Sequence, residues 1–313
     1  MRSFWLLLYL ASFAFALPGQ TPDGVKTVDL LPGFRRCLDD LPADPVRSSA
    51  AFRRWLQAAE PDVCRHLSSL PADPAGWSAY LAEARRLLPV MVLLSRRCMQ
   101  VEPEVVHRLQ QRFPDFDPAR VELTLGFSLF RFDARIPYDH PTQLWLGLDG
   151  IASAHGAECR LDVLLAHEMF HVYHFQNNPQ PNAGRSVPLY RQVWQEGLAC
   201  YVARQLYPEA SPADVFLDPN LAATGPRYVA TTARALLDDL QTDDDAATSR
   251  YLAYHVSTGA LPARMGYLLG YDVVSRCAVT QSLAQLSRLR GENLLRLMQK
   301  ELHGLIQAPP AVP

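Results

Sequence analysis

The chain has 313 residues, of which 49% are hydrophobic and 20% charged, and this is ordinary for a globular protein with a buried core. Its length suits one large domain or two modest ones. The formal net charge of −2 gives no general attraction to nucleic acid or to an anionic membrane surface, so neither is expected as a partner.

The N-terminus predicts export from the cytoplasm. Met1 and Arg2 form a short basic start, an almost wholly apolar run extends from Phe4 to Ala16, and residues 14–16 have the small-x-small pattern of a signal peptidase site. The run is shorter than the roughly 20 residues of a membrane span, although an uncleaved anchor is the alternative. We therefore expect residues 1–16 to be a signal peptide, cleaved after Ala16. The mature chain, starting near Leu17, would be secreted or periplasmic and have no stable membrane span.

Six cysteines suit an oxidising compartment: Cys37, Cys64, Cys98, Cys159, Cys200 and Cys277. An even number permits disulfides, but the sequence does not choose a pairing. No two cysteines have the CxxC spacing, so a zinc site built from thiolates is not indicated. The alternative is that several are small buried hydrophobic residues.

Residues 17–120 are expected to form a helical N-terminal region. Apolar residues recur every three or four positions in segments 51–60, 77–97 and 104–112, and Pro-rich breaks such as residues 70–74 separate them. The sequence leaves open whether this region caps the rest of the chain, extends it, or contains an inhibitory pro-segment.

From residue 121 the pattern changes to that of an α+β domain. Segment 121–132 alternates with period two, and 143–148 is a second strand, closed by the turn pair Asp149-Gly150. Helices follow at 162–175, capped by Asp162, at 188–206, opened by Pro188, and as three or four more within 228–305. We predict an α+β domain over 121–307, predominantly helical with a small, mostly antiparallel sheet. Residues 308–313 are expected to be a disordered tail.

The segment from His167 to His171 reads His-Glu-Met-Phe-His, an HExxH motif inside a predicted helix. Side chains four residues apart share one helix face, about 5–6 Å between Cβ atoms, so two imidazoles can converge on one Zn²⁺. Glu168 is turned about 100° round the axis, so it misses the metal but reaches a water on it. Zinc lowers the pKa of such a water to about 7, so a carboxylate can deprotonate the water at neutral pH. We expect one Zn²⁺ per chain, with Glu168 as catalytic base.

A catalytic zinc needs a third protein ligand, and Glu196 is the best candidate. It follows a loop, on a second predicted helix in which Gly197 and Ala199 would allow a close approach to the first. The alternative for Glu196 is a surface or salt-bridged carboxylate. Cys200 would face the same way as Glu196, and a packed thiol or half-cystine is expected there.

His174 is not expected to be a ligand, although it shares a helix face with His167 and His171. Seven residues of helix rise about 10 Å, too far for three ligands of one straight helix to meet. His174 is expected behind the ligands or on the surface. Metzincins have glycine at this position and His or Asp three residues later, so His174 and Asn177 disfavour that class.

An HExxH motif followed by a glutamate on the next helix resembles the gluzincins, the thermolysin-like class of zinc peptidases. The resemblance implies that residues 121–307 form a zincin-like catalytic domain. The stretches His167-Glu-Met-Phe-His-Val-Tyr-His-Phe-Gln and Glu196-Gly-Leu-Ala are similar to a little-characterised group of predicted zinc-dependent proteases. The resemblance covers roughly residues 144–274. It implies that the edge strand at 143–148 pairs with the extended backbone of the substrate.

Gluzincins add a Tyr or His donor that stabilises the oxyanion, and the resemblance implies one here. Tyr267 is preferred, because the stretch Gly266-Tyr-x-x-Gly-Tyr271 also resembles the same group and puts its two tyrosines on one helix face. The other candidates are Tyr254, His255 and Tyr271. The alternative for each tyrosine is a core residue with its hydroxyl at the edge.

These features predict a zinc metallopeptidase, a hydrolase whose partner is a peptide or protein substrate. A non-catalytic, zinc-stabilised binding protein is one alternative, although it would not need Glu168. A zinc hydrolase of non-peptide amides or esters is the other. The sequence does not indicate the substrate, the cleavage preference or the oligomeric state.

Overall fold

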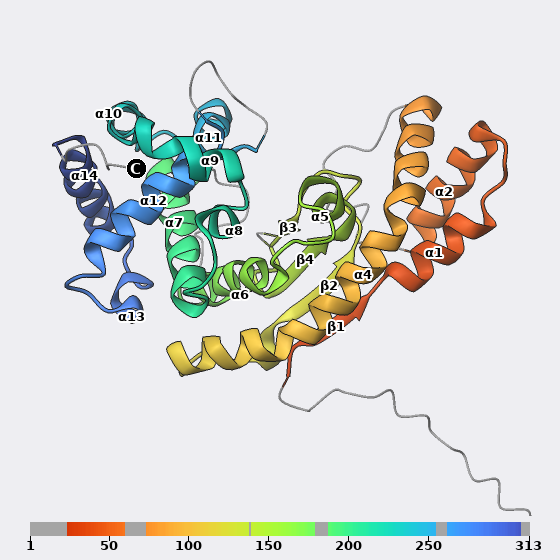
Figure 1. Cartoon of the computed structure of the whole chain (residues 1–313), viewed down its shortest axis with the longest axis horizontal. Coiled ribbons are helices and arrows are strands. Elements are labelled where there is room, and N and C mark those ends of the chain that lie inside the picture. The colour runs from red at the N-terminus through yellow and green to blue at the C-terminus, as the bar shows by residue number, and fades with distance from the viewer. Residues whose placement is uncertain (1–23, 60–72, 138, 179–186, 255–261, 308–313) are drawn as a thin grey trace, which may run out of the picture.

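The computed structural model describes residues 24–59, 73–137, 139–178, 187–254 and 262–307 (Figure 1). The expected signal peptide, Leu17, Cys64, His255 and the expected tail at 308–313 lie outside these ranges. No helix within them has the length and apolar character that crossing a bilayer requires.

The described ranges form a mostly helical α+β fold, as expected, around one small sheet. The N-terminal half contributes β1 (Lys26–Asp29), α1 (Leu31–Asp40), α2 (Pro45–Ala59), α4 (Pro74–Arg112), η1 (Pro118–Arg120), β2 (Glu122–Gly126), β3 (Ala134–Arg135), β4 (Gln143–Gly147) and α5 (Leu148–Ala154). The C-terminal half contributes α6 (Leu161–Asn177), α7 (Leu189–Leu206), α8 (Pro212–Phe216), α9 (Pro219–Thr224), η2 (Gly225–Tyr228), α10 (Val229–Asp239), α11 (Asp245–Leu252), α12 (Met265–Cys277), α13 (Leu283–Leu286) and α14 (Gly291–Gln307). One hydrophobic core runs through both halves, from Val25 to Leu305.

The sheet is mixed, so the expected antiparallel sheet is wrong. Its strand order is β1-β2-β4-β3, in which β1 and β4 both pair in parallel with β2 and only β3 pairs antiparallel with β4. Parallel neighbours need a long crossover connection, and the segment containing α1, α2 and α4 provides the one between β1 and β2. The N-terminal region, expected to be helical, therefore also contributes a strand.

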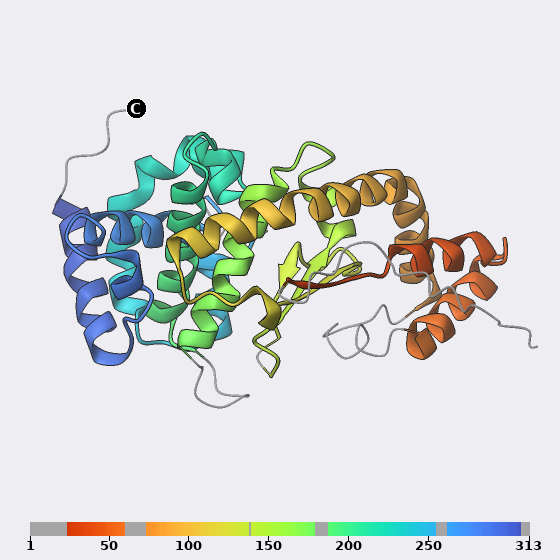
Figure 2. The same ribbon diagram turned by 90° about the horizontal axis from the view of Figure 1, so that it is seen from below.

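The long helix α4 replaces two helices that were expected at 77–97 and 104–112. Pro89 and Pro103 lie inside it, and each removes one backbone hydrogen bond. The buried face nevertheless continues across the second proline, through Cys98, Val105 and Leu109. Packing of this face against α5 and α6 outweighs the local cost of the prolines, and α4 runs beside the sheet as one continuous, bent helix (Figure 2).

The strand expected at 121–132 is confirmed only as far as Gly126. Leu129 and Phe130 have positive φ angles of 55° and 58°, so the chain leaves the sheet and forms a loop. The expected turn at Asp149-Gly150 is wrong as well, since both residues belong to α5.

The C-terminal half is a lobe of helices in which α7 lies between α6 and α12 (Figure 1). The helices expected at 162–175 and 188–206 are confirmed as α6 and α7, but Arg160 rather than Asp162 occupies the cap position of α6. Helix α6 is buried on almost every side and has no marked apolar stripe, as is typical of a helix enclosed by neighbours.

The described cysteines agree with the second interpretation of the sequence, in which thiols act as small buried hydrophobic residues. Cys37, Cys98, Cys159, Cys200 and Cys277 are all buried and free. Burial raises the pKa of Cys37 and Cys277 to about 11 and that of Cys98 and Cys159 to about 12, so these thiols stay protonated.

Candidate active site

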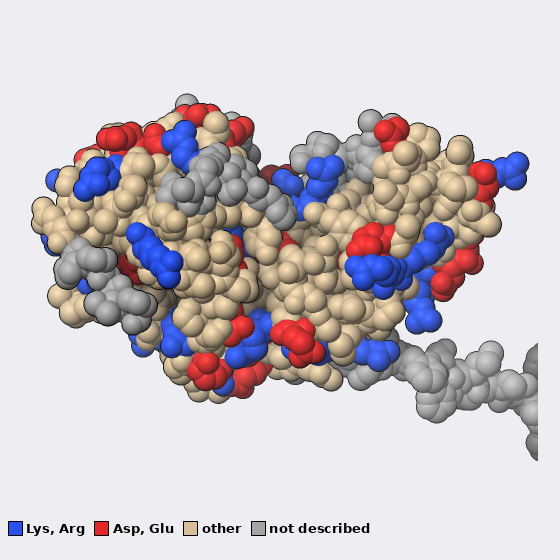
Figure 3. All heavy atoms as spheres, turned by 45° about the horizontal axis from the view of Figure 1, so that its top comes forward, with Lys and Arg blue, Asp and Glu red and all other residues tan. Residues whose placement is uncertain are grey.

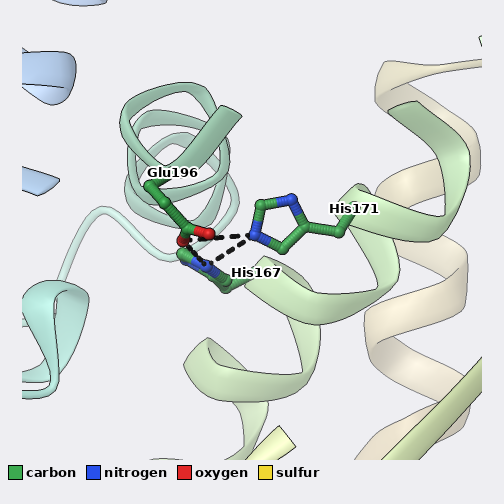
Figure 4. A group of neighbouring side chains, drawn as sticks. All are labelled: His167, His171 and Glu196. Carbon is green, nitrogen blue, oxygen red and sulfur yellow. Dashed lines mark hydrogen bonds and ion pairs between the residues drawn. The ribbon is translucent and has the colours of Figure 1, made fainter. Parts of the chain in front are cut away.

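Helix α6 presents His167 and His171 from successive turns on one face, toward α7 (Figure 4). Each is only 5% exposed. Their Nε2 atoms are 3.0 Å apart, which is the convergence expected from the four-residue spacing.

Helix α7 brings Glu196 to the same point. Its Oε2 atom lies 3.2 Å from Nε2 of His167 and 3.4 Å from Nε2 of His171. The helix is held by a backbone contact on its other side: a Cβ added to Gly197 would lie 2.0 Å from the carbonyl carbon of Gly270 in α12. Gly197, which was expected to bring α7 close to α6, therefore packs α7 against α12 instead.

The geometry of the three side chains fits a tetrahedral zinc ion. Ligands about 2.0–2.1 Å from zinc at tetrahedral angles are about 3.3 Å apart. The three ligand atoms of His167, His171 and Glu196 are 3.0, 3.2 and 3.4 Å apart. They are a group able to hold a metal ion. Two imidazoles and a carboxylate are also a donor set that catalytic zinc accepts, with a fourth position left open.

The electrostatics of the group favour a cation. Burial lowers the pKa of His167 to about 4, so its ring is neutral at pH 7 and has a lone pair to offer. Burial would raise the pKa of Glu196, but His171 and His167 hold it well below its usual value. Burial alone would lower the pKa of His171, yet the Glu196 carboxylate raises it. The carboxylate of Glu196 therefore stabilises positive charge at His171, and the same electrostatics suit a bound metal cation.

Cys200 orients the ring of His167. Its Sγ atom is 3.6 Å from the carbonyl oxygen of Val215 and 3.7 Å from Nδ1 of His167. Because the S–H donates to the carbonyl, the sulfur accepts from an Nδ1–H, which leaves Nε2 of His167 unprotonated and facing the other ligands. Such outer contacts commonly set the tautomer of a ligating histidine. Of the two roles expected for Cys200, a packed thiol or a half-cystine, the structure has the packed thiol, and its contact with His167 was not predicted.

His174 is not part of the ligand group. It is 2% exposed, which excludes the surface position and leaves the other expected one, behind the ligands; its ring centroid lies 5.7 Å from that of Phe170. Burial lowers its pKa to about 3, which keeps the ring neutral and suits the aromatic surroundings.

Glu168 is partly buried and lines a cavity of about 430 Å³ on one side and a second of about 210 Å³ on the other. Ala134 and Tyr267 also line both cavities, whereas His171 and Glu196 line only the second. The two cavities therefore meet at Glu168. On the face that Figure 3 draws, a notch separates two lobes of the molecule. Burial raises the pKa of Glu168 to about 7, and the carboxylates of Glu196 and Asp133 add to this effect.

Tyr267 is the oxyanion candidate nearest to the ligands among the described tyrosines. Its ring is stacked on that of His167, with 6.2 Å between the centroids. Tyr254 lines the larger cavity only, with its ring edge-on to His155. Tyr271 instead packs among aromatic rings, 5.7 Å from Tyr201.

The strand β3 lies at the edge of the sheet beside the cleft. The sequence had instead predicted that residues 143–148 would be this edge strand. Residues 143–147 form β4, which lies inside the sheet: β2 pairs along its whole length, and β3 pairs with Trp145 and Leu146 on the other side. Strand β3 has two residues, and the first, Ala134, lines both cavities. A two-residue strand carries no detectable periodicity in the sequence.

The loop between β2 and β3 is organised by Asp149, a fully buried carboxylate at the start of α5. It accepts hydrogen bonds from the backbone nitrogens of Ser128, at 2.7 Å, and Phe130, at 3.0 Å. These bonds stabilise the positive φ angles of Leu129 and Phe130, and Phe130 lines the larger cavity. The cleft wall therefore depends on a residue that the sequence analysis assigned to a turn.

The comparisons with known proteins point the same way. A family model described as "Predicted Zn-dependent protease (DUF2268)" matches residues 150–296. The chain is similar to a predicted zinc protease over this range. It includes α6, α7 and α12, and with them every residue of the ligand group. No curated protein and no solved structure matches the chain.

Proposed function

We propose that the chain is a zinc metallopeptidase of the gluzincin type that hydrolyses peptide bonds with Glu168 as general base. The observation that supports this most strongly is the triangle of Nε2, Nε2 and Oε2 atoms, with separations of 3.0–3.4 Å, beside a glutamate in a cleft. A purely structural metal site has no use for that carboxylate.

His167, His171 and Glu196 would hold the zinc ion through these three atoms. A bound zinc ion supplies a Lewis acid that polarises a carbonyl and lowers the pKa of water to about 7. The thiol of Cys200 keeps His167 in the tautomer that such binding requires.

Glu168 carries the proton in this proposal. Its raised pKa of about 7 lets the carboxylate take a proton from the attacking water at neutral pH and return it to the leaving amine. Its place where the two cavities meet lets it reach both the water and the scissile bond.

Tyr267 and β3 would position the substrate. The Tyr267 hydroxyl donates to the developing oxyanion, which suits its place beside His167 and Glu168. The edge of β3 pairs with an extended substrate backbone by adding a strand to the sheet.

The test combines metal analysis with digestion of a peptide library. The wild-type chain should contain one zinc per chain and cleave peptides, and Glu168→Gln should keep the zinc and lose at least 10³-fold in kcat/KM, on the order expected for a lost catalytic group. The surface variant Glu292→Gln, from an exposed carboxylate in α14, is the matched control.

Each alternative function has its own outcome in this test. Zinc bound without any hydrolysis would favour a non-catalytic binding protein. Hydrolysis of acyl esters or non-peptide amides, with peptides left intact, would favour the other zinc hydrolase.

Export remains part of the proposal and rests on the N-terminal sequence alone. Expression of the full chain in a host with a secretory pathway should give a mature protein that begins near Leu17. N-terminal sequencing of the exported product measures this, and retention in the cytoplasm with Met1 intact would contradict it.

A further inference from the structure

Arg264 is a buried cation in the wall of the cleft. It is 7% exposed, and it lines the larger cavity together with Glu168 and Tyr267. Its guanidinium carbon lies 4.0 Å above the ring centroid of Tyr267 and 5.6 Å from that of Tyr254. Within the described parts of the chain, no carboxylate forms an ion pair with it.

Among the residues that the structure describes, the groups around Arg264 leave most of its hydrogen-bonding capacity unused. A guanidinium has five N–H donors in a planar fork, and the side chain of Tyr267 takes one hydrogen bond. Aromatic faces attract the charge but accept no further N–H. Glu196 raises the pKa of Arg264 at longer range, yet its Oε2 is committed to the two histidines. A buried charge with so little compensation is costly unless a ligand supplies the partner.

The backbone holds this side chain in place at a further cost. Arg264 has φ 58° and ψ 23°, the left-handed conformation that side chains other than glycine rarely adopt, and it is the residue that precedes α12. Such residues persist where the surroundings over-determine them, and they cluster at ligand-binding sites. The side chain is also held against the first turn of α12, because Tyr267, three residues on, carries the ring under the guanidinium.

The cavity has room for a substrate group beside Arg264. Its volume of about 430 Å³ is in the range of small-molecule sites. The other acid that lines it, apart from Glu168, is Asp133, whose Oδ2 is 2.8 Å from Nε2 of His155. Arg131 lines it too. Asp133 is therefore already engaged, while the guanidinium fork of Arg264 matches the two oxygens of a carboxylate.

We propose that Arg264 is a subsite for a substrate carboxylate, so that the enzyme selects peptides with a carboxylate close to the scissile bond. The carboxylate belongs either to the peptide's C-terminus or to an acidic side chain, and both present the same two oxygens to the fork. This inference rests on the proposed function, because it assigns the substrate class of the same cleft.

The experiment uses the full chain and four matched peptides: one with a free C-terminal acid, its C-terminal amide, and amidated versions with an internal Glu or Gln. Binding is measured by calorimetry with the zinc-loaded Glu168→Gln variant, in which the peptides are not cleaved during the titration. The value of kcat/KM is measured with the chain that keeps Glu168. At least one carboxylate peptide should bind at least about 10-fold tighter than its neutral partner, as suits a charge-assisted pair. Preference for the free acid indicates a C-terminal subsite, and preference for internal Glu an acidic-side-chain subsite.

Arg264→Gln should abolish this preference, and Arg264→Lys should keep part of it, since lysine retains the charge but not the fork. The control Arg250→Gln removes an arginine that pairs with Asp239 on the surface and should leave the preference intact. Thermal unfolding and zinc content verify that each variant folds.

Two results would overturn the proposal: equal binding of carboxylate and neutral peptides by the chain with Arg264 intact, or an unchanged preference in Arg264→Gln. Failure of the proposed function would look different, because carboxylate peptides would still bind selectively while no peptide was cleaved.

Discussion

Gly197→Ala is expected to displace Glu196 without touching any ligand. A Cβ at position 197 would lie 2.0 Å from the carbonyl carbon of Gly270, whereas ordinary van der Waals contact begins at 3.4 Å. The difference (3.4 − 2.0) requires α7 and α12 to separate by about 1.4 Å at this point. Both sides of the contact are backbone, so no side chain can rotate out of the way.

Two losses should follow. Overpacking costs about 1–3 kcal/mol, and more when backbone must move, against about 1 kcal/mol that alanine gains over glycine in a helix, so we expect a net loss near 2 kcal/mol. Metal–ligand distances tolerate only about 0.2 Å, so a displaced Glu196 should lower zinc affinity by about 10-fold or more. Thermal unfolding measures the first effect, and competition with a chromophoric chelator the second.

Gly33→Ala is the matched control, since it makes the same change in helix α1, where the added Cβ would be 4.0 Å from the ring of Trp55. It should leave zinc affinity unchanged and raise stability by up to about 1 kcal/mol. If Gly197→Ala melts like the wild type and binds zinc equally well, the account of how α7 is positioned is wrong.

Three further predictions test single residues. Cys200→Ala should weaken zinc binding about 10-fold in chelator competition, since His167 loses the contact that sets its tautomer, and Cys200→Ser should restore most of it; equal affinities in all three chains would remove this role. Tyr267→Phe should lower kcat about 10²-fold with little change in KM, on the scale of one lost oxyanion donor, while Tyr271→Phe should be neutral, and the reverse ranking in steady-state kinetics would reassign the donor. Burial raises the pKa of Asp272 from 3.8 to about 6, so its ionisation destabilises the fold and stability falls as the pH rises from about 4 to about 6. Asp272→Asn should therefore gain about 1–3 kcal/mol at pH 7 and nothing below pH 4 in chemical unfolding, and a gain independent of pH would contradict the assignment.

The ligand group could be predicted because most of its geometry is local. Two histidines four residues apart on a helix must share a face, whatever surrounds the helix. Glu196 needed only one long-range assumption, that the next helix returns alongside the first. The structure brings its Oε2 within 3.4 Å of both imidazoles.

The contacts around that group depend on long-range packing and left no local pattern. Cys200 faces His167 only because α7 packs against α6 with that side turned toward it. The side chain of Arg264 reaches the cleft because its own backbone, just before α12, is in the left-handed conformation. Asp149 looks like part of a turn in the sequence, since Asp-Gly after a strand is the usual signature of one. Its role as a buried acceptor appears only when the loop folds back onto α5.

The errors in the fold have similar causes. Strand β1 has four residues with a half-exposed pattern, too short to stand out in a helical region, and without it the parallel pairing was not apparent. Helix α4 continues through Pro103 because its buried face stays in register, a tertiary effect that overrides the local breaker.

X-ray absorption at the zinc edge tests the central claim most directly, on the full chain loaded with one equivalent of zinc and on its Glu196→Ala variant. The account predicts two imidazole nitrogens and a carboxylate oxygen at about 2.0–2.1 Å in the wild type, with the oxygen contribution reduced in the variant. A sulfur neighbour at about 2.3 Å, or identical spectra from the two proteins, would contradict a centre built from His167, His171 and Glu196.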